Sequence, residues 1–378
     1  MKRIAILGST GSIGRQTLDV VRAFPDEFDV VALSAWSNRD LLLAQAKEFH
    51  PTLLSSKEQW PAESLPPGTR IAETLEEIVT NPDVDLIIQG MVGNIGLLPT
   101  LQALDAGKQV AMANKEPIVM AGELLMQAAA RGGGQLLPVD SEPSAIWQCL
   151  QGEETQRTVR RLIITASGGA LRDLPLDEVA KVTPEQALKH PTWSMGKKIT
   201  IDCATLMNKG FEVIESHWLF NMPWDQVDVV IHHQSIIHSM VEFTDGSMKA
   251  QMGAPDMRLP IQYAMFYPKR MASEEIPRFD PIATGSLTFE EMNPDRYPCF
   301  VSALEAGHAG GTYPTVLSAS DETAVDLFLK GRIGFTDIHR LVASTLERHE
   351  STERPTLEDI LSADEWARQA VLSATENS

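Results

Sequence analysis

Short apolar runs alternate with helical patterns along the first 140 residues. Runs such as Ile4–Leu7, Val30–Ser34 and Asp85–Ile88 have the length of strands, and glycine or polar residues bound them. Between the first two runs, apolar residues including Leu18 recur at helical spacing. Strands that alternate with helices are typical of a parallel sheet covered by helices. We therefore predict an α/β protein whose residues 1–140 form a Rossmann-like domain.

Residues 141–266 show a different pattern. Arg161–Ala166, Val227–His232 and Ile236–Phe243 are predicted strands, and Thr244–Ser247 contains the Asp-Gly pair of a hairpin turn. Strands joined by hairpins indicate a central α+β domain. A free edge of such a sheet is a natural pairing surface, so we expect a homodimer.

The remaining chain divides at Cys299. Prolines recur through residues 267–298 without periodicity, which predicts an extended linker. Helical patterns then continue to Ala370, and residues 299–378 are predicted to form a helical bundle. Gly310–Thr315 interrupts this run, and the next helix is expected around Asp321–Lys330.

Composition narrows the functional classes. The chain has 378 residues and a formal charge of −19, which argues against a nucleic acid or an anionic membrane as the main partner. No apolar run approaches the roughly 20 residues that span a bilayer, and no signal peptide precedes the first strand. Three cysteines without metal-type spacing favour a reduced setting. We expect a cytoplasmic protein.

A glycine-rich turn follows the first strand directly and leads into a helix. Strand, turn and helix together are the context of a dinucleotide fingerprint, in which glycines let a pyrophosphate approach the helix N-terminus. A glycine turn without a ligand is the alternative, but its place after the first strand favours nucleotide binding. The residues concerned are Gly8, Ser9, Thr10, Gly11, Ser12, Ile13 and Gly14.

The end of the second strand bears on the choice of nucleotide. An NAD-binding fold would carry a carboxylate there for the ribose 2′-hydroxyl. This chain instead has Ser37, Asn38 and Arg39, which could hold a 2′-phosphate. Arg39 acting only as a surface residue is the alternative. The pattern favours NADP over NAD.

Two carboxylates, Asp140 and Glu142, come directly after another apolar run. In extended backbone they would share a face with Ser141 opposed. Pro143 favours an extended Glu142, and a helix is expected over residues 144–150. Ligands bind at strand ends in α/β sheets. A solvated acidic loop is the alternative reading of this segment alone.

Further polar residues follow other predicted strands. Lys115 comes after the run that ends at Ala113, where it could orient a substrate oxygen. Ser167 opens a Ser-Gly-Gly turn, which offers backbone N–H groups and a hydroxyl to a phosphate. His190–Lys198 is a loop whose Trp193 lies outside any apolar periodicity. Such a loop could close over a ligand. The alternatives are that Lys115 is an ordinary surface lysine, that the Ser-Gly-Gly turn only reverses the chain, and that Trp193 packs under its own loop.

A second acidic position lies in a predicted helix. Asn208 and Glu212 are one turn apart, with Lys209 beside them, on a face that differs from the apolar one containing Phe211. A solvated helix acid is the alternative for Glu212.

In this order and spacing, these segments resemble the 1-deoxy-D-xylulose 5-phosphate reductoisomerases, a family of NADPH- and divalent-metal-dependent enzymes of isoprenoid precursor biosynthesis. The resemblance runs nearly end to end. It rests on Gly8–Gly14, Asn114–Glu116, Val139–Glu142, Ser167–Gly169, His190–Lys198, Asn208–Glu212, His238–Met240 and Gly311–Leu317.

The resemblance implies conversion of 1-deoxy-D-xylulose 5-phosphate, a small phosphorylated sugar, to 2-C-methyl-D-erythritol 4-phosphate. Asp140, Glu142 and Glu212 match the ligands of one Mg²⁺ or Mn²⁺, with Co²⁺ as a further candidate. Three carboxylates suit such a hard ion. These three residues and Lys115 are the implied catalytic set.

The same resemblance assigns the binding residues. For NADPH they are the turn from Gly8 to Gly14, the cluster Ser37, Asn38 and Arg39, and Asn114, Glu116 and Gly196. For substrate they are Lys115, Ser141, Glu142, Ser167, His190, Trp193, Met195, Cys203, Asn208, Lys209 and Glu212. His238 matches a histidine near the site, and its role stays open.

Three positions depart from the usual family pattern. Pro143 replaces a histidine, Cys203 replaces a phosphate-binding serine, and Ser318–Asp321 replaces Asn-Ala-Ala-Asn. A thiol is a weaker hydrogen-bond donor than a hydroxyl. The first two departures therefore bear on the strength of substrate binding.

Two other functions remain as alternatives. An enzyme similar to aspartate-semialdehyde dehydrogenase would need an activated cysteine, but Cys149 lies in an apolar helix and neither Cys203 nor Cys299 has an evident base. An NADP-sensing regulator without catalysis would have no need of the three carboxylates.

Overall fold

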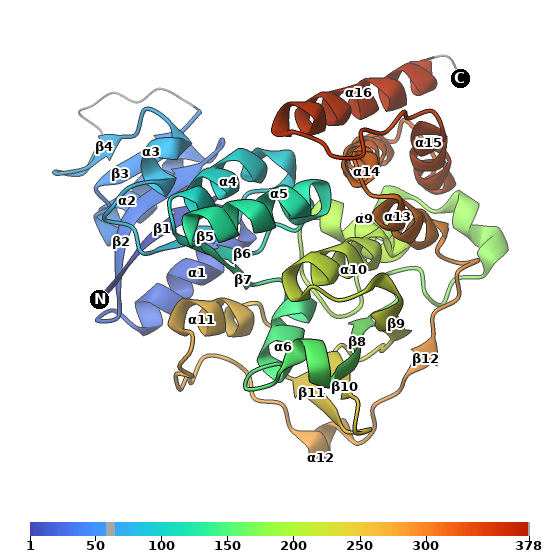
Figure 1. Cartoon of the computed structure of the whole chain (residues 1–378), viewed down its shortest axis with the longest axis horizontal. Helices are drawn as coiled ribbons and strands as arrows, with labels where there is room; N and C mark the ends of the chain where they lie inside the picture. The colour runs from blue at the N-terminus through green and yellow to red at the C-terminus, as the bar shows by residue number, and fades with distance from the viewer. Residues whose placement is uncertain (58–64, 377–378) are drawn as a thin grey trace. The chain divides into compact units, whose positions relative to one another are not determined.

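The structure, a computed structural model, describes residues 1–57 and 65–376 and divides into two compact units (Figure 1). Over the described ranges, no helix combines the length and apolar character needed to cross a membrane. The first unit comprises Met1–Pro117, Glu123–Ser144 and Asp256–Pro277, and the second comprises Ile118–Gly122, Ala145–Pro255 and Arg278–Ser378.

The first unit is built on a seven-stranded sheet in the order β4-β3-β2-β1-β5-β6-β7. Every neighbouring pair is parallel, so the carboxyl ends of the strands meet at one edge. The predicted Rossmann-like domain is confirmed. The strands are β1 (Lys2–Leu7), β2 (Phe28–Ala35), β3 (Leu53–Ser56), β4 (Arg70–Ile71), β5 (Leu86–Gln89), β6 (Gln109–Met112) and β7 (Gln135–Pro138).

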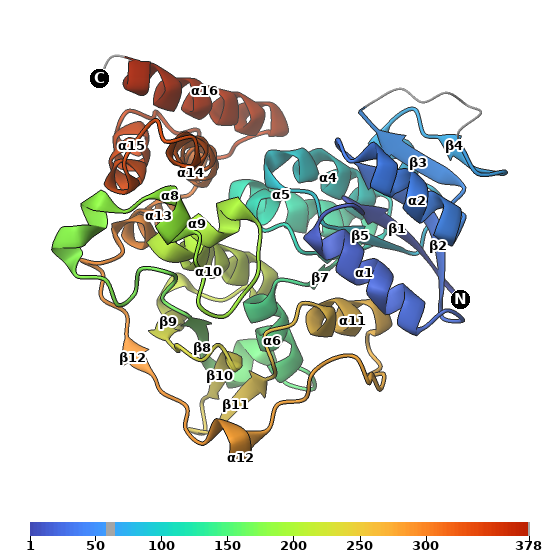
Figure 2. The ribbon, with the colours of Figure 1, turned by 180° about the vertical axis from the view of Figure 1, so that it is seen from behind.

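Helices cover both faces of this sheet. Helix α1 packs with α11 on the face that is toward the viewer in Figure 2, and α4 and α5 lie on the other face (Figure 1). The helical elements of this unit are α1 (Ser12–Ala23), α2 (Arg39–Phe49), α3 (Leu75–Val79), the 3₁₀ turn η2 (Gly93–Gly96), α4 (Leu97–Asp105), α5 (Glu116–Gly132) and α11 (Arg258–Phe266).

Helix α11 belongs to this unit, although the predicted boundary placed it in the central domain. The ring of Phe266 lies 4.8 Å from those of Phe24 and Phe28, in edge contacts. Lys2 also donates a hydrogen bond to the Met265 carbonyl. These contacts join segments more than 200 residues apart in the chain, and the local apolar pattern cannot reveal such a separation.

The second unit contains a five-stranded mixed sheet in the order β11-β10-β8-β9-β12. Strand β8 is parallel to β9 and antiparallel to β10, and β10 forms the predicted hairpin with β11 across Gly246, where φ is +87°. The predicted α+β character is confirmed. The strands are β8 (Val159–Ala166), β9 (Val227–Ile231), β10 (Ile237–Phe243), β11 (Met248–Met252) and β12 (Glu290–Glu291).

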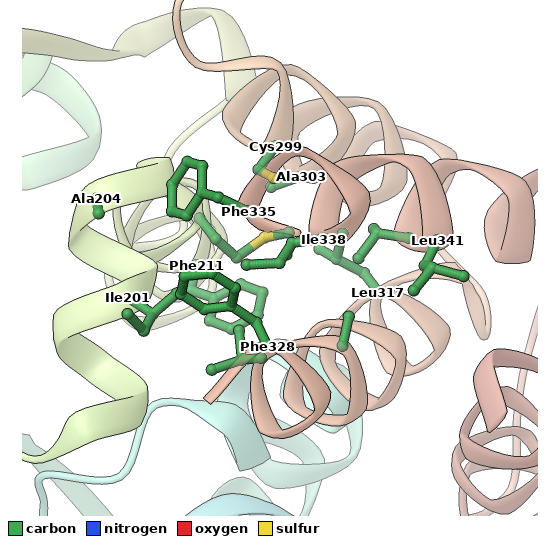
Figure 3. Packing of buried hydrophobic residues seen from close by; sticks show 14 of the residues in the cluster. Ile201, Ala204, Phe211, Cys299, Ala303, Leu317, Phe328, Phe335, Ile338 and Leu341 are labelled. Carbon is green, nitrogen blue, oxygen red and sulfur yellow. The ribbon is translucent and has the colours of Figure 1, made fainter. Parts of the chain in front are cut away.

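The C-terminal helices share one hydrophobic core with α9 and α10 (Figure 3). Phe211 and Phe328 are fully buried there, and the Phe328 ring packs edge-on against Phe335 at 5.5 Å. The predicted C-terminal helices are confirmed over the described residues 299–376, while residues 377–378 lie outside them; the helices form one unit with the central sheet. The helices concerned are α9 (Lys197–Thr205), α10 (Met207–Phe220), α13 (Pro298–Ala309), α14 (Tyr313–Leu329), α15 (Phe335–Glu347) and α16 (Leu357–Glu376).

Helix α14 spans Tyr313–Leu329 and contains most of the helix expected around Asp321–Lys330. Pro314 lies in its first turn, where a residue without an N–H loses no hydrogen bond. The interruption is therefore confined to Gly310–Thr312. The remaining short helical elements are α6 (Ser141–Cys149), α7 (Thr155–Thr158), η3 (Leu176–Lys181), α8 (Pro184–Ala187), η4 (Trp224–Gln226) and α12 (Pro281–Thr284).

Four buried or half-buried histidines make the second unit sensitive to acid. Burial lowers the pKa of His217, His232, His339 and His349, so the folded unit favours neutral rings. The unfolded chain binds these protons near pH 6.5, so their contribution is present above that pH and is lost as the pH falls below it. We expect calorimetry to show a midpoint roughly 4 °C lower at about pH 5.5 than at about pH 7.5. An unchanged midpoint would contradict this linkage.

Candidate active site

Asp140 and Glu142 lie where β7 passes into α6. The Ser144 N–H donates to the Asp140 carbonyl at 2.8 Å, so α6 begins at Ser141 and Glu142 lies in its first turn. The predicted extended arrangement, with a helix starting at residue 144, is therefore wrong. Pro143 is accommodated because the first turn of a helix needs no N–H there.

The two carboxylates lie close together. Their oxygens are within 4.8 Å of each other, and the Ser141 hydroxyl donates to Glu142 Oε2 at 2.5 Å. Asp140 is only 13% exposed at its side chain. Oxygen ligands in this arrangement can hold a hard divalent cation.

Lys115 provides a cation at this edge of the sheet. It directly precedes α5, and β6 pairs with β7 in a register that joins Met112 to Pro138. The Lys115 ammonium consequently lies 2.7 Å from Asp140 Oδ2, and its side chain is 5% exposed. The prediction that Lys115 lies at a ligand-binding strand end agrees with this position.

In the second unit, Glu212 is completely buried in α10. Asn208 Nδ2 donates to Glu212 Oε1 at 2.6 Å, and Lys209 Nζ lies 2.7 Å from Oε2. The solvated helix acid is thereby excluded, because a buried carboxylate needs such partners. The three side chains form one polar cluster on α10.

Ser167 and His190 meet in a second polar cluster. The His190 Nδ1 atom accepts hydrogen bonds from the backbone N–H groups of Thr192 and Trp193, at 3.3 and 3.0 Å. The neutral ring therefore carries its proton on Nε2, which donates to Ser167 Oγ at 3.0 Å. The Gly169 N–H also points at this hydroxyl, at 3.2 Å. A hydroxyl held in one orientation can donate a hydrogen bond to a phosphate.

Arg172 is a cation near this cluster that the sequence motifs did not predict. Its guanidinium donates to the carbonyls of Ser167 and His233, at 2.9 and 3.2 Å. It fixes the Ser-Gly-Gly turn against the loop after β9. In the sequence, the only sign of this contact is that Arg172 follows Ser167 by five residues.

The loop before α9 contains Trp193 and Met195, both half-buried. The Trp193 ring lies 5.9 Å from that of His238. Gly196 precedes α9 directly, and its carbonyl accepts a hydrogen bond from the Thr200 hydroxyl at 2.8 Å. That this loop covers a ligand stays a prediction.

A buried ion-pair cluster anchors α9. Lys198 Nζ lies 2.5 Å from Asp202 Oδ2 and 3.0 Å from Asp321 Oδ2.

Two cysteines lie near this cluster. Cys203 follows on this helix and is 7% exposed. Burial, with Asp321 and Asp202 nearby, raises the pKa of the Cys299 thiol. A protonated, buried thiol is a poor nucleophile, so Cys299 does not suit a cysteine-dependent dehydrogenase.

The glycine-rich turn has the geometry of a nucleotide-binding loop. Gly8 has φ +80°, and a Cβ atom on Gly14 would come within 2.3 Å of the Ser9 backbone. Ser9 is buried and its hydroxyl donates to Gln45, so its side chain faces α2. Gly11 and Ser12 are exposed at the start of α1. The remaining turn residues are Thr10, half-buried, and Ile13, half-buried.

Other predicted cofactor residues lie along the same carboxyl edge of the sheet. Asn114 is buried and donates to the Gly93 carbonyl at 2.9 Å, and Glu116 opens α5. Asn38 caps α2 by accepting the Leu41 N–H. Ser37 and Arg39 flank this cap, so the cluster after β2 lies at the carboxyl edge as predicted.

Comparison with known proteins identifies the family. Models described as "1-deoxy-D-xylulose 5-phosphate reductoisomerase", its "C-terminal domain" and "DXP reductoisomerase C-terminal domain" match residues 4–122, 136–220 and 252–370. The chain is 49% identical to a 1-deoxy-D-xylulose 5-phosphate reductoisomerase of Exiguobacterium sibiricum, over 99% of both chains. It is also 49% identical to "1-deoxy-D-xylulose 5-phosphate reductoisomerase 2" of Bacillus cereus, over 98% of this chain and 99% of the relative.

Solved structures agree with this assignment. The reductoisomerase of Zymomonas mobilis in complex with NADPH has a TM-score of 0.92 and 39% identity, and each chain is covered completely. A reductoisomerase in complex with NADPH, fosmidomycin and magnesium has the same TM-score and 37% identity, over 100% of this chain and 98% of the other. The chain therefore belongs to the 1-deoxy-D-xylulose 5-phosphate reductoisomerase family.

Proposed function

We propose that this protein converts 1-deoxy-D-xylulose 5-phosphate to 2-C-methyl-D-erythritol 4-phosphate, with NADPH as the hydride donor and one divalent cation. The carboxylate pair Asp140 and Glu142, beside the buried ammonium of Lys115, carries the proposal. Family membership supports it, since relatives have been solved with NADPH and magnesium. One NADPH and one proton are consumed for each product formed.

The donor chemistry fits a hard cation. Asp140, Glu142 and Glu212 offer only carboxylate oxygens, which Mg²⁺, Mn²⁺ and Co²⁺ accept. When bound, the cation acts as a Lewis acid on the substrate oxygens. Asn208 and Lys209 hold the Glu212 carboxylate in one orientation, which suits it to act as a ligand of the cation.

The protein's own residues bind and orient the substrate. The Ser167 hydroxyl can donate to the phosphate, and His190 and the Gly169 N–H hold that hydroxyl in place. Lys115 and Ser141 would contact the sugar chain near the carboxylates. Closure of the loop that contains Trp193 would exclude water from the reacting carbons. The further residues proposed for substrate are Met195, Cys203, Asn208 and Lys209.

For NADPH, the turn from Gly8 to Gly14 would receive the pyrophosphate at the start of α1.

Product identification tests the function directly. NMR of a reaction with NADPH and Mg²⁺ should show the branched polyol phosphate, and a chelator should abolish its formation. Recovery of unchanged pentulose phosphate from a reaction with saturating Mg²⁺ would refute the proposal.

The proposal also includes a cytoplasmic homodimer. Strand β11 is an edge of the five-stranded sheet, and its residues Met248 and Met252 are 50% and 38% exposed. An exposed edge with apolar side chains favours pairing. Light scattering at the mass of two chains would support the dimer, and a single-chain mass at micromolar protein would contradict it.

Cys203 provides a test of the phosphate site. Cys203→Ser restores a stronger hydroxyl donor, so we expect the KM for the pentulose phosphate to fall by about threefold with kcat nearly unchanged. Cys203→Ala removes the donor and serves as the matched variant, with an expected rise in KM. Identical KM values for the serine and alanine variants would show that this position makes no hydrogen bond to substrate.

A further inference from the structure

An exposed tryptophan and a lysine meet beside the predicted 2′-phosphate cluster. Strands β2 and β3 are parallel, and their register ends with Ala35 opposite Ser56. The next residues along each strand are Trp36 and Lys57. The Lys57 ammonium lies 4.6 Å from the centre of the Trp36 ring.

The Trp36 side chain is not part of the core. It is 58% exposed, although tryptophan is among the most extensively buried side chains on average. A cation over an indole face is attracted by the electrons of the ring. This contact restricts Lys57, whose long side chain would otherwise sample many rotamers. The tryptophan thus holds a positive charge at the carboxyl edge of β3.

The glycine-rich turn places this charge relative to a nucleotide. The Ser9 N–H donates to the Ser34 carbonyl at 2.8 Å, and the Gly8 N–H donates to the Ser34 hydroxyl at 3.2 Å. The turn is therefore tied to the end of β2. In this fold the pyrophosphate lies at the turn, and the adenosine ribose lies over the end of the second strand. Strand β3 is the next strand outward from β2, so Lys57 lies beside the strand end that receives the ribose.

The cluster after β2 supplies few charges for that phosphate. A phosphate monoester carries nearly two negative charges at neutral pH. Ser37 is uncharged, and the Asn38 oxygen already accepts the Leu41 N–H as the cap of α2. Arg39 contributes one positive charge. A second cation is needed for near-neutrality, and Lys57 is a lysine held beside this cluster.

We propose that Lys57, held over the Trp36 ring, binds the 2′-phosphate of NADPH and determines the preference for NADPH over NADH. This inference rests on the proposed use of NADPH. Because NADH lacks the 2′-phosphate, the contribution of Lys57 is specific to one cofactor. A general structural role would alter the binding of both.

Equilibrium binding separates these possibilities without requiring turnover. In Lys57→Gln, fluorescence titration should show about tenfold weaker NADPH binding and an NADH Kd within about twofold of wild type. Lys57→Arg keeps the charge and should retain most of the NADPH affinity. Lys47→Gln removes another exposed lysine, from α2, and should change neither Kd.

The salt dependence provides a second readout. The NADPH Kd of Lys57→Gln should rise less steeply with salt than that of wild type, because one ion pair is missing. An equal loss for NADPH and NADH, or no loss for either, would overturn the assignment of Lys57. Failure of the wild-type protein to bind NADPH at all would instead overturn the proposed function.

Discussion

Replacing Glu212 with glutamine is expected to lower kcat by at least about a hundredfold at fixed Mg²⁺. Glutamine keeps the shape of the side chain and an oxygen for Asn208, but it removes the negative charge that faces Lys209. The amide oxygen is a weaker ligand for a hard cation than a carboxylate oxygen. The loss should therefore appear as weaker metal affinity together with a lower rate.

Metal titration distinguishes this effect from damage to the fold. Activity of Glu212→Gln should require much more Mg²⁺ for half-saturation, and calorimetric Mn²⁺ binding should weaken in parallel. Glu305→Gln removes the same charge from an exposed position on α13 and should behave as wild type. Unaltered metal affinity in Glu212→Gln would show that this carboxylate is not a ligand.

A methyl group at Gly169 is expected to disrupt the phosphate site. The glycine has φ +71°, and a Cβ atom there would lie 2.3 Å from the Cys203 carbonyl oxygen, which is backbone and cannot move without α9. The Ser-Gly-Gly turn must consequently shift away from α9. Because the Gly169 N–H donates to the Ser167 hydroxyl, we expect the KM for the pentulose phosphate to rise by tenfold or more, about 1.4 kcal/mol of binding free energy per tenfold.

Gly152→Ala is the matched control for this substitution. Gly152 has φ +82°, so alanine there carries the same backbone strain, but no heavy atom lies within 4 Å of the new Cβ. It should cost about 1 kcal/mol of stability without changing KM. If both variants bind substrate normally, the close approach of Gly169 to α9 does not position the phosphate site.

The fold was predictable where local patterns decide it. Ile4–Leu7 and Val30–Ser34 are apolar runs of strand length, and the glycine turn between strand and helix has few alternative conformations. The hairpin at Gly246 follows from its Asp-Gly pair. These elements depend on neighbouring residues, and the structure confirms each of them.

The remaining features depend on contacts between distant segments. Glu142 is a local exception: it was predicted to be extended because Pro143 disfavours a helical residue before it, but the Asp140 carbonyl accepts the Ser144 N–H and starts α6 earlier. The place of α11 depends on Phe266 meeting aromatic rings near the N-terminus. The pairing of Lys198 with Asp321 spans more than 100 residues.

The candidate site likewise combines residues that the sequence reveals with a residue whose burial it does not reveal. The residue types and their strand-end positions were visible in the sequence for Lys115 and Asp140, because parallel strands end at a common edge. The buried state of Glu212 was not visible, because a lone helix acid is usually solvated. Only the packing of α10 against both the sheet and the C-terminal helices buries it.

NADPH absorbance provides the most direct test of the central claim. Purified protein with 1-deoxy-D-xylulose 5-phosphate should consume NADPH steadily in Mg²⁺, Mn²⁺ or Co²⁺, and the rate should fall to background when the metal is chelated. Tight NADPH binding with no decrease in absorbance in any of the three metals would contradict the claim and would favour an NADP-sensing regulator.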